Sequence, residues 1–374
     1  MTGTRESALA RLCRCAHVWL PGYMKDRWIR RHRPPVRRVW LTFADHYEPL
    51  CGGADTQLAF ARVRYWAERW PVIAAQHHDS IGRPAKYTFF YAQEEYRPEF
   101  LDPLAAMTQS GIADVEVHLH HDGEGEQNFI DRMSTFIEVL HRRHGLLRIR
   151  DGQPSFGFIH GDWALDNSSP DGRDCGLNNE LLLLKKLGCY ADFTFPAFPH
   201  SSQPRLVNTI YWATDDPERP KSYDTGVPIT PGCAATGDLM IVPGPLGLNW
   251  NGGRLMPRVE VGELAGHNPM TSQRVKLWLD NAPSIGGDVF IKLFAHGALE
   301  NNAEALLGRD ISLVLKEIMQ FSDRQGFQVC FVSASEMWKA IEALRLERDP
   351  IAAVLSSEME YLSDDGAGEE RYQQ

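Results

Sequence analysis

The sequence predicts an α/β protein whose core is a mostly parallel sheet, either open or closed into a barrel. Three observations support this fold class. Strand-like and helix-like patterns alternate over about 300 residues. The chain has 374 residues, of which 43% are apolar and 24% charged, so it can bury a full core. Unusual polar residues follow the expected strands, at the edge where parallel sheets place their active sites.

The expected strands differ in pattern. Residues 36–43 combine β-branched and aromatic side chains and end at a polar cluster. Residues 87–91 (YTFFY) are typical of a buried strand, whereas 115–120 (VEVHLH) alternate strictly, which places His118 and His120 on one face. Apolar runs predict the remaining strands, at 155–160, 191–195, 207–212, 238–242, 289–294 and 328–332.

Helices are expected between these strands. Residues 58–75 have helical spacing, with Pro71 marking the end. An apolar stripe from Phe129 to Leu140 predicts an amphipathic helix. Further helices are expected at 179–187, 271–280, 311–325 and 335–346, the last opening with the capping-box spacing of Ser333 and Glu336.

The chain divides into three regions by composition. Residues 1–35 form a basic arm, 36–350 a single α/β domain, and 351–374 an acidic tail that we expect to be mobile. Within the domain, residues 197–260 are rich in proline and glycine, which predicts a long excursion over one end of the sheet.

Charge and hydropathy exclude some functions. The net charge of −10 argues against non-specific nucleic-acid binding, and no apolar run reaches the roughly 18 residues of a membrane span. Residues 1–38 carry ten Lys and Arg but only two acids, a net charge of +8. This arm is therefore expected to lie against the acidic body, an anionic membrane surface as a peripheral contact, or another subunit. Seven scattered cysteines indicate reduced thiols and a cytoplasmic protein.

Four polar groups follow predicted strands and contain six of the fourteen histidines. Because the carboxyl ends of parallel strands meet at one edge of the sheet, we expect these groups to lie close together. They are Asp45-His46-Tyr47-Glu48, His118-Leu119-His120-His121-Asp122, His160-Gly161-Asp162-Trp163, and His296 with Glu300.

Histidine with carboxylate suits a divalent metal ion that keeps one coordination position open. Such an ion lowers the pKa of a bound water towards about 7, so that hydroxide is available at neutral pH. A nearby carboxylate can accept the proton, and a further histidine can donate one to the leaving group. We therefore expect a metal-dependent hydrolase, with zinc as the metal and nickel, cobalt or manganese as alternatives.

Motifs for competing chemistries are absent from the sequence. There is no Gly-x-Gly-x-x-Gly after a strand and no P-loop, which leaves nucleotide binding without support. Gly-x-Ser-x-Gly and His-Glu-x-x-His are also missing, which disfavours a serine hydrolase and a zincin-type protease.

In their order, the four groups resemble the motifs of the polysaccharide deacetylases (carbohydrate esterase family four). That family opens with Thr-Phe-Asp-Asp, and residues 42–45 read Thr-Phe-Ala-Asp. Its paired metal-binding histidines correspond to residues 118–122, its groove segment loosely to 158–163, and its late Leu-x-x-His motif to 293–296. The resemblance runs from about residue 38 to 335 and implies an irregular, seven-stranded β/α barrel over 36–350.

The resemblance implies that Asp45 is a metal ligand and His296 the general acid. Ala44 stands where the family has its base, so Glu48 or Asp162 would supply that function. Residue 122 is aspartate where the family spacing places histidine, and strand alternation instead favours His118 and His120 as ligands beside Asp45. The additional candidates for the metal or its surroundings are His46, His121, Asp122 and His160.

The implied substrate is an N-acetylated sugar or a related envelope or exopolysaccharide carbohydrate. The chain has ten tryptophans, and large aromatic rings stack on sugar faces. The candidate stacking residues are Trp163, Trp250 and Tyr47, of which Trp250 falls in a predicted exposed turn.

Two alternatives remain open. Ala44 and the altered histidine spacing favour a non-catalytic carbohydrate-binding or scaffold protein with a degenerate barrel. The other alternative is a metal phosphoesterase or amidohydrolase, but in those enzymes the His-x-His pair usually follows the first strand, whereas here it follows the third.

Overall fold

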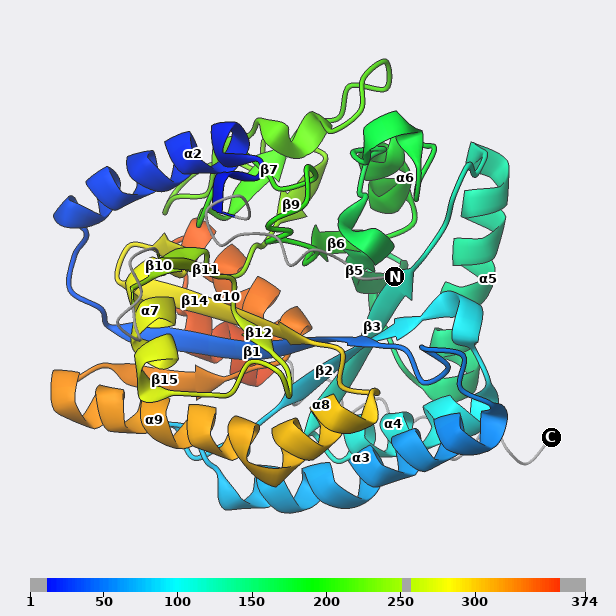
Figure 1. Ribbon diagram of the computed structural model, residues 1–374, viewed down its shortest axis with the longest axis horizontal. Coiled ribbons are helices and arrows are strands. Elements are labelled where there is room, and N and C mark those ends of the chain that lie inside the picture. The colour runs from blue at the N-terminus through cyan, green and yellow to red at the C-terminus, as the bar shows by residue number, and fades with distance from the viewer. Residues whose placement is uncertain (1–11, 251–256, 357–374) are drawn as a thin grey trace, which may run out of the picture.

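The computed structural model describes residues 12–250 and 257–356, in which strands and helices alternate along most of the chain (Figure 1). The strands are β1 (Arg38–Tyr47), β2 (Tyr87–Ala92), β3 (Ala113–Leu119), β4 (Arg148–Arg150), β5 (Gln153–His160), β6 (Cys189–Asp192), β7 (Tyr211–Ala213), β8 (Val227–Pro228), β9 (Leu239–Ile241), β10 (Gly247–Asn249), β11 (Arg258–Glu260), β12 (Glu263–Leu264), β13 (Ser284–Ile285), β14 (Asp288–Ala295) and β15 (Gln328–Phe331).

Most strands of the described chain join one sheet in the order β12-β14-β1-β2-β3-β5-β6-β9-β7-β8. Pairing is parallel from β12 to β9, and antiparallel where β7, β8, β4 and β13 attach. Strand β15 pairs in parallel with the first half of β1, and β10 and β11 form a separate hairpin. The predicted mixed α/β class with a mostly parallel sheet is therefore confirmed.

The helices lie mainly in the connections between parallel strands. They are α2 (Ala16–Ile29), α3 (Thr56–Gln76), α4 (Pro98–Gln109), α5 (Glu126–His144), α6 (Glu180–Lys186), α7 (Ser272–Asn281), α8 (Glu300–Ala305), α9 (Ile311–Gln325) and α10 (Ala334–Arg345). A π-helical turn, Leu306–Asp310, joins α8 to α9, and residues 350–356 are also helical. The remainder of the expected acidic tail, from residue 357, lies outside the described residues.

Each predicted strand and helix overlaps an observed one, but some boundaries differ. Helix α3 continues past Pro71 to Gln76, so the expected end at Pro71 is wrong. Burial of Trp70, Ile73 and Ala74 on the sheet offsets the hydrogen bond that proline cannot make. The sequence reasoning missed α4, which begins at Pro98, a residue that suits the first turn of a helix. The predicted capping box of α10 is present.

The two faces of the sheet pack against different elements. Odd-numbered residues of β1, such as Val39 and Phe43, join the large core that contains α3, α4, α5 and α9. Even-numbered residues, such as Trp40 and Ala44, join a smaller core with α10. In Figure 1, α3, α4 and α9 run below β1, while α10 lies behind the sheet. The alternation of side chains along each strand therefore assigns every residue to one of two environments.

The strand pairings of the described residues form an open path, so a closed barrel is not seen. The gap near β14 is bridged by side-chain contacts instead. The ammonium of Lys292, on β14, donates to the carbonyl oxygens of Phe193 and Phe195, each at 2.5 Å. These two residues follow β6, so Lys292 links both sides of the gap.

Helix α2, part of the basic arm, packs on the expected excursion at 197–260. Trp19 and Tyr23 join an apolar cluster with Val207 and Leu246 of that segment. The guanidinium of Arg30 donates to the carbonyl oxygens of Asn281 and Ala282. The described part of the arm, from residue 12 on, therefore lies against the body of the protein, which was the first of the three expectations for the arm. Within the described part of the chain, no helix is long and apolar enough to cross a membrane.

A buried ion pair fixes the start of β1 against β14. Arg38 contacts Asp288 at 2.6 and 3.1 Å, and the indole N–H of Trp40 donates to the same carboxylate at 2.9 Å. Asp288 is fully buried. Replacing Asp288 with alanine should lower the free energy of unfolding by about 3–5 kcal/mol, because the Arg38 charge loses its partner. Urea denaturation measures this loss.

The control is Asp280→Ala, which removes an exposed partner of Lys276 and should change stability little. Equal stability of the two variants would contradict the role assigned to Asp288.

Candidate active site

Four neighbouring strands bring polar residues together at their carboxyl ends. The sheet order β14-β1-β2-β3 places His296, which follows β14, beside His46 in β1. On the far side of β2 lies His118, in β3, and Glu48 follows β1. These side chains lie on the face of the sheet that carries the smaller core. His46, His118 and His296 therefore lie close together, as expected for histidines at the ends of neighbouring parallel strands.

Glu48 is the centre of the group. Its Oε1 lies 2.9 Å from Nε2 of His118 and 3.4 Å from Nε2 of His120. The ring of His46 lies 5.0 Å from that of His118 and 4.7 Å from that of His296, measured between centroids. His46, Glu48 and His118 are buried, and one ligand atom of each lies within 4.8 Å of the other two, which suits a metal ion.

The hydrogen bonds of His118 leave its Nε2 available as a ligand. Its Nδ1 lies 2.8 Å from the carbonyl oxygen of Ile159, which can only accept, so Nδ1 carries the proton. In the neutral ring, the lone pair of Nε2 then points at the carboxylate of Glu48. Burial favours the neutral acid, but the hydrogen bond with His118 and the charges of neighbouring histidines lower the pKa of Glu48 to about 2. A proton on Nε2, or a metal ion in its place, satisfies these two atoms at 2.9 Å.

His46 offers a further free nitrogen. Its Nε2 is buried and has no hydrogen-bond partner. Burial, followed by the charges of His296 and His118, lowers the pKa of His46 well below its ordinary value. A buried, neutral imidazole with an unpartnered nitrogen fits a metal ligand, because an unsatisfied polar atom is otherwise costly.

His120 lies at the mouth of this cluster and is half-buried. Its Nδ1 contacts Oε1 of Glu94 at 2.5 Å, which holds the ring with Nε2 towards Glu48. Burial disfavours its charged form, yet the Glu94 hydrogen bond and charge raise the pKa of His120 to about 9. Glu94 follows β2 and was missed in the sequence. The same inspection of residues after the strand 87–91 would have found it.

Asp45 lies apart from this cluster. Because side chains alternate along β1, its carboxylate points to the opposite face from His46. There it accepts hydrogen bonds from the backbone N–H of Gly297 at 2.6 Å and from the hydroxyl of Tyr87 at 3.0 Å. Burial raises the pKa of Asp45 to about 7. Asp45 thus anchors the turn that carries His296, rather than lying among the candidate ligands.

The other candidate residues lie outside the cluster. Asp162 is exposed, with a positive φ of 51°, and its charge reaches His120. Trp163 is half-buried, with its ring 6.2 Å from that of His200. Tyr47 is fully buried among Trp66, Phe89 and Tyr91, so a sugar cannot stack on it. Trp250 is 63% exposed. Asp122 is exposed and accepts from the backbone of Asp174.

His121 and His160 belong to a second buried group, on the helix-covered face of the sheet. There they meet Cys175 and Glu180, at ligand-atom separations within 4.8 Å. Neither Cys175 nor Glu180 was among the sequence candidates. Cys175 lies in an irregular loop and Glu180 opens α6, so no strand-end pattern marks them.

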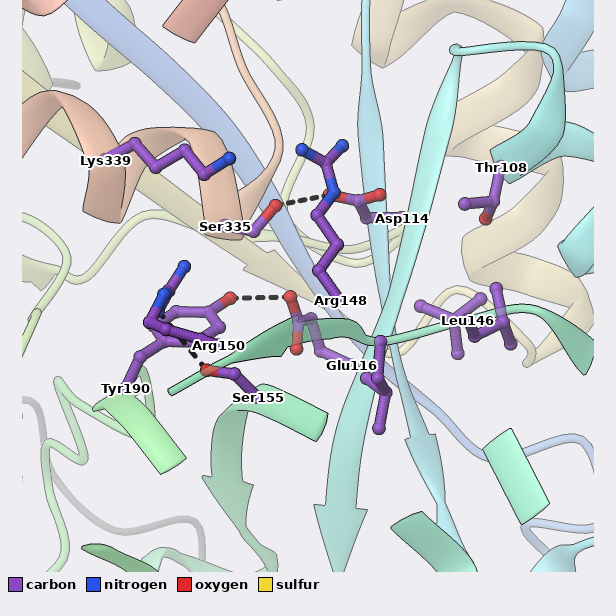
Figure 2. A pocket seen from close by; sticks show the side chains of 12 residues that line it. Thr108, Asp114, Glu116, Leu146, Arg148, Arg150, Ser155, Tyr190, Ser335 and Lys339 are labelled. Atoms are coloured by element: carbon purple, nitrogen blue, oxygen red, sulfur yellow. Dashed lines mark hydrogen bonds between the residues drawn. The ribbon is translucent and has the colours of Figure 1, made fainter. Parts of the chain in front are cut away.

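A small cavity at the other end of the sheet also contains ionisable groups (Figure 2). Glu116 accepts from the hydroxyl of Tyr190 and the backbone N–H of Gly157, both at 2.5 Å. Ser335, on α10, donates to Asp114 at 2.6 Å. The cavity measures about 20 Å³, which is room for water but not for a sugar. We therefore interpret it as structural.

No protein-family model and no curated protein matches this chain. The likeness to polysaccharide deacetylases rests on the short motifs alone, and function must be argued from the site.

The turn after β14 depends on glycine at position 297. A Cβ there would overlap Oδ2 of Asp45 and the ring of Trp66, and the carbonyl of Gly297 accepts from the Trp66 indole at 2.7 Å. Gly297→Ala should therefore lower the free energy of unfolding by about 1–3 kcal/mol, as overpacking does. Thermal unfolding measures the loss.

The matched control is Gly308→Ala, since a Cβ at Gly308 meets nothing within 4 Å and alanine favours a helix. If both variants unfold at the temperature of the unsubstituted protein, Gly297 does not hold this turn.

Proposed function

We propose that this protein is a metal-dependent hydrolase whose ion is held by His46, Glu48 and His118. The observation that carries the proposal is the group of three buried ligands, in which Nε2 of His46 has no partner and Nε2 of His118 faces a carboxylate. Three protein ligands with half-buried histidines beside them are typical of a catalytic site, which keeps a coordination position open. Zinc is the metal that this donor set favours.

Hydrolysis of an acetamide adds water across the C–N bond. The water oxygen bonds to the carbonyl carbon and loses a proton, and the amine nitrogen gains a proton as the C–N bond breaks. When bound, the metal would supply a nucleophilic water at neutral pH and polarise the carbonyl oxygen. The protein must then supply one proton acceptor and one proton donor.

His296 and His120 both lie beside the proposed metal ligands. The resemblance assigns the donor role to His296, which lies beside His46. His120 is held by Glu94 with Nε2 towards Glu48, and its pKa of about 9 keeps it protonated at neutral pH, so it is a second proton donor and Asp162 is the candidate acceptor. Glu48 serves as a ligand in this arrangement rather than as the base, and the exposed Asp162 lies at the rim.

The substrate class follows from the resemblance. We propose an N-acetylated sugar of an envelope or exopolysaccharide carbohydrate, cleaved within an irregular and incompletely closed barrel. Trp163, next to the exposed Asp162, is the aromatic side chain best placed to contact a sugar. The seven cysteines are odd in number and scattered along the chain, which favours a cytoplasmic location.

One observation favours a second candidate function, that of a carbohydrate-binding protein without catalysis. Ala44 packs in the smaller core, on the same face as His46, where the family would carry its base. Metal analysis and an assay separate the two functions. The second function would be supported if the protein binds sugar, binds no metal and does not turn over substrate.

Removal of a ligand tests the metal. His118→Ala should lose one equivalent of bound metal relative to the unsubstituted protein, measured by elemental analysis after purification without a His tag. His267→Ala is the control, since His267 is exposed and should retain all metal. Equal metal content in the two variants would contradict the proposal that His118 is a metal ligand.

Replacement of His296 tests the proton donor. His296→Ala should keep its metal yet release acetate from N-acetylglucosamine oligomers about 10²–10⁴-fold more slowly, because the leaving amine lacks a donor. An unchanged rate would show that another group protonates the amine.

A further inference from the structure

A second set of metal-ligand side chains lies on the opposite face of the sheet, independent of the proposed catalytic site. Nε2 of His121 is 2.9 Å from Nε2 of His160 and 3.0 Å from Oε1 of Glu180. Nε2 of His160 lies 3.4 Å from Oε1 of Glu180, Sγ of Cys175 lies 3.4 Å from Oε2 of Glu180, and the ligand atoms of all four residues lie within 4.8 Å of one another. Ligands about 2.0–2.3 Å from a tetrahedral zinc ion lie about 3.3–3.8 Å apart, so little movement is needed.

The outer nitrogen of His160 is oriented as a metal ligand requires. Nδ1 of His160 lies 2.5 Å from the carbonyl oxygen of Gly161, which can only accept, so this nitrogen carries the proton. Nδ1 of His121 is buried without a hydrogen-bond partner and lies 3.5 Å from Oε2 of Glu124, whose Oε1 contacts Arg132 at 3.0 Å. The carbonyl partner fixes the ring of His160 with its Nε2 free for a metal.

Nε2 of His121, Nε2 of His160 and Oε1 of Glu180 converge on one point. The side chains of these three residues are fully buried, so water does not reach the point where they meet. A divalent cation at the centre satisfies all three atoms at once.

Cys175 completes the group from the loop before α6. Its sulfur accepts from the backbone N–H of Asn167 at 3.2 Å and from that of Leu177 at 3.4 Å. The thiol donates to Oε2 of Glu180 at 3.4 Å and to the carbonyl oxygen of Leu177 at 3.7 Å, and a bound metal ion would displace that proton. A thiolate among nitrogen ligands favours zinc over magnesium or calcium.

We propose that His121, His160, Cys175 and Glu180 bind a structural zinc ion. Four protein ligands with no exposed member describe a closed site, in contrast to the cluster around Glu48, which has half-buried histidines at its mouth. The ion serves to hold the fold rather than to bind substrate.

The zinc ion would tie the irregular loop 161–179 to the ends of β3 and β5. This loop holds six non-glycine residues with positive φ, a conformation that must be held by surrounding contacts. They are Asp162, Trp163, Asp166, Asn167, Asp171 and Asp174. The loop begins at Gly161, where a Cβ would overlap the ring of His120. The structural ion would therefore also support the wall of the catalytic cluster.

Elemental analysis of single variants tests the proposal. Cys175→Ala should lose one equivalent of zinc relative to the unsubstituted protein. Cys330→Ala, which removes a different buried thiol, should lose none. His46→Ala should lose only the ion at the catalytic cluster, so failure of that site and failure of this one give different results. If both Cys175→Ala and Glu180→Gln keep the full zinc content, the proposal is overturned.

Two measurements on the unsubstituted protein cover the case in which these variants fail to fold. Replacement of zinc by cobalt should produce a sulfur-to-cobalt charge-transfer absorption, because Cys175 is the cysteine within the cluster. Chelation should lower the Tm and speed tryptic cleavage after Arg173, an exposed residue of the loop. Absence of the absorption, with cleavage unaffected by chelator, would contradict a structural zinc.

Discussion

The side chains of a β-strand alternate between its two faces, and this constraint decides which polar residues of the protein can meet. On β1, His46 points to the face with the smaller core, while its neighbour Asp45 points to the helices. After β3, His120 turns towards Glu48 and His121 towards Glu180. Adjacent residues therefore serve different clusters, and a shift of one residue in either strand would exchange them.

The order of the parallel strands in the sheet decides which strand-end residues are neighbours. Because β14, β1, β2 and β3 are neighbours, the residues that follow them form a row at one edge of the sheet. Glu94 after β2 lies between the residues of β1 and β3 and orients His120. Asp45, from the other face, holds the turn after β14 through Gly297. The candidate catalytic cluster is thus held from both faces of the sheet.

The two clusters differ in how they are enclosed, and this difference separates their roles. The cluster around Glu48 is built from strand ends and has His120 and His296 half-buried at its mouth. The group around Glu180 is sealed by the loop 161–179 and by α6. Burial without water makes uncompensated carboxylate and imidazole groups costly, so each cluster calls for a cation.

The sequence by itself determined the α/β class, the approximate position of each predicted strand, and the shared face of His118 and His120, because these depend on local periodicity. The motif assigned Asp45 a ligand role that strand alternation excludes, because the structure places His46, its neighbour on β1, in the cluster. The sequence did not identify Cys175 and Glu180 as candidate ligands, because they lie in a loop and at the start of a helix, which no periodic pattern marks. Only the tertiary structure brings them to His121 and His160, since contacts between distant segments depend on how the chain closes around the sheet.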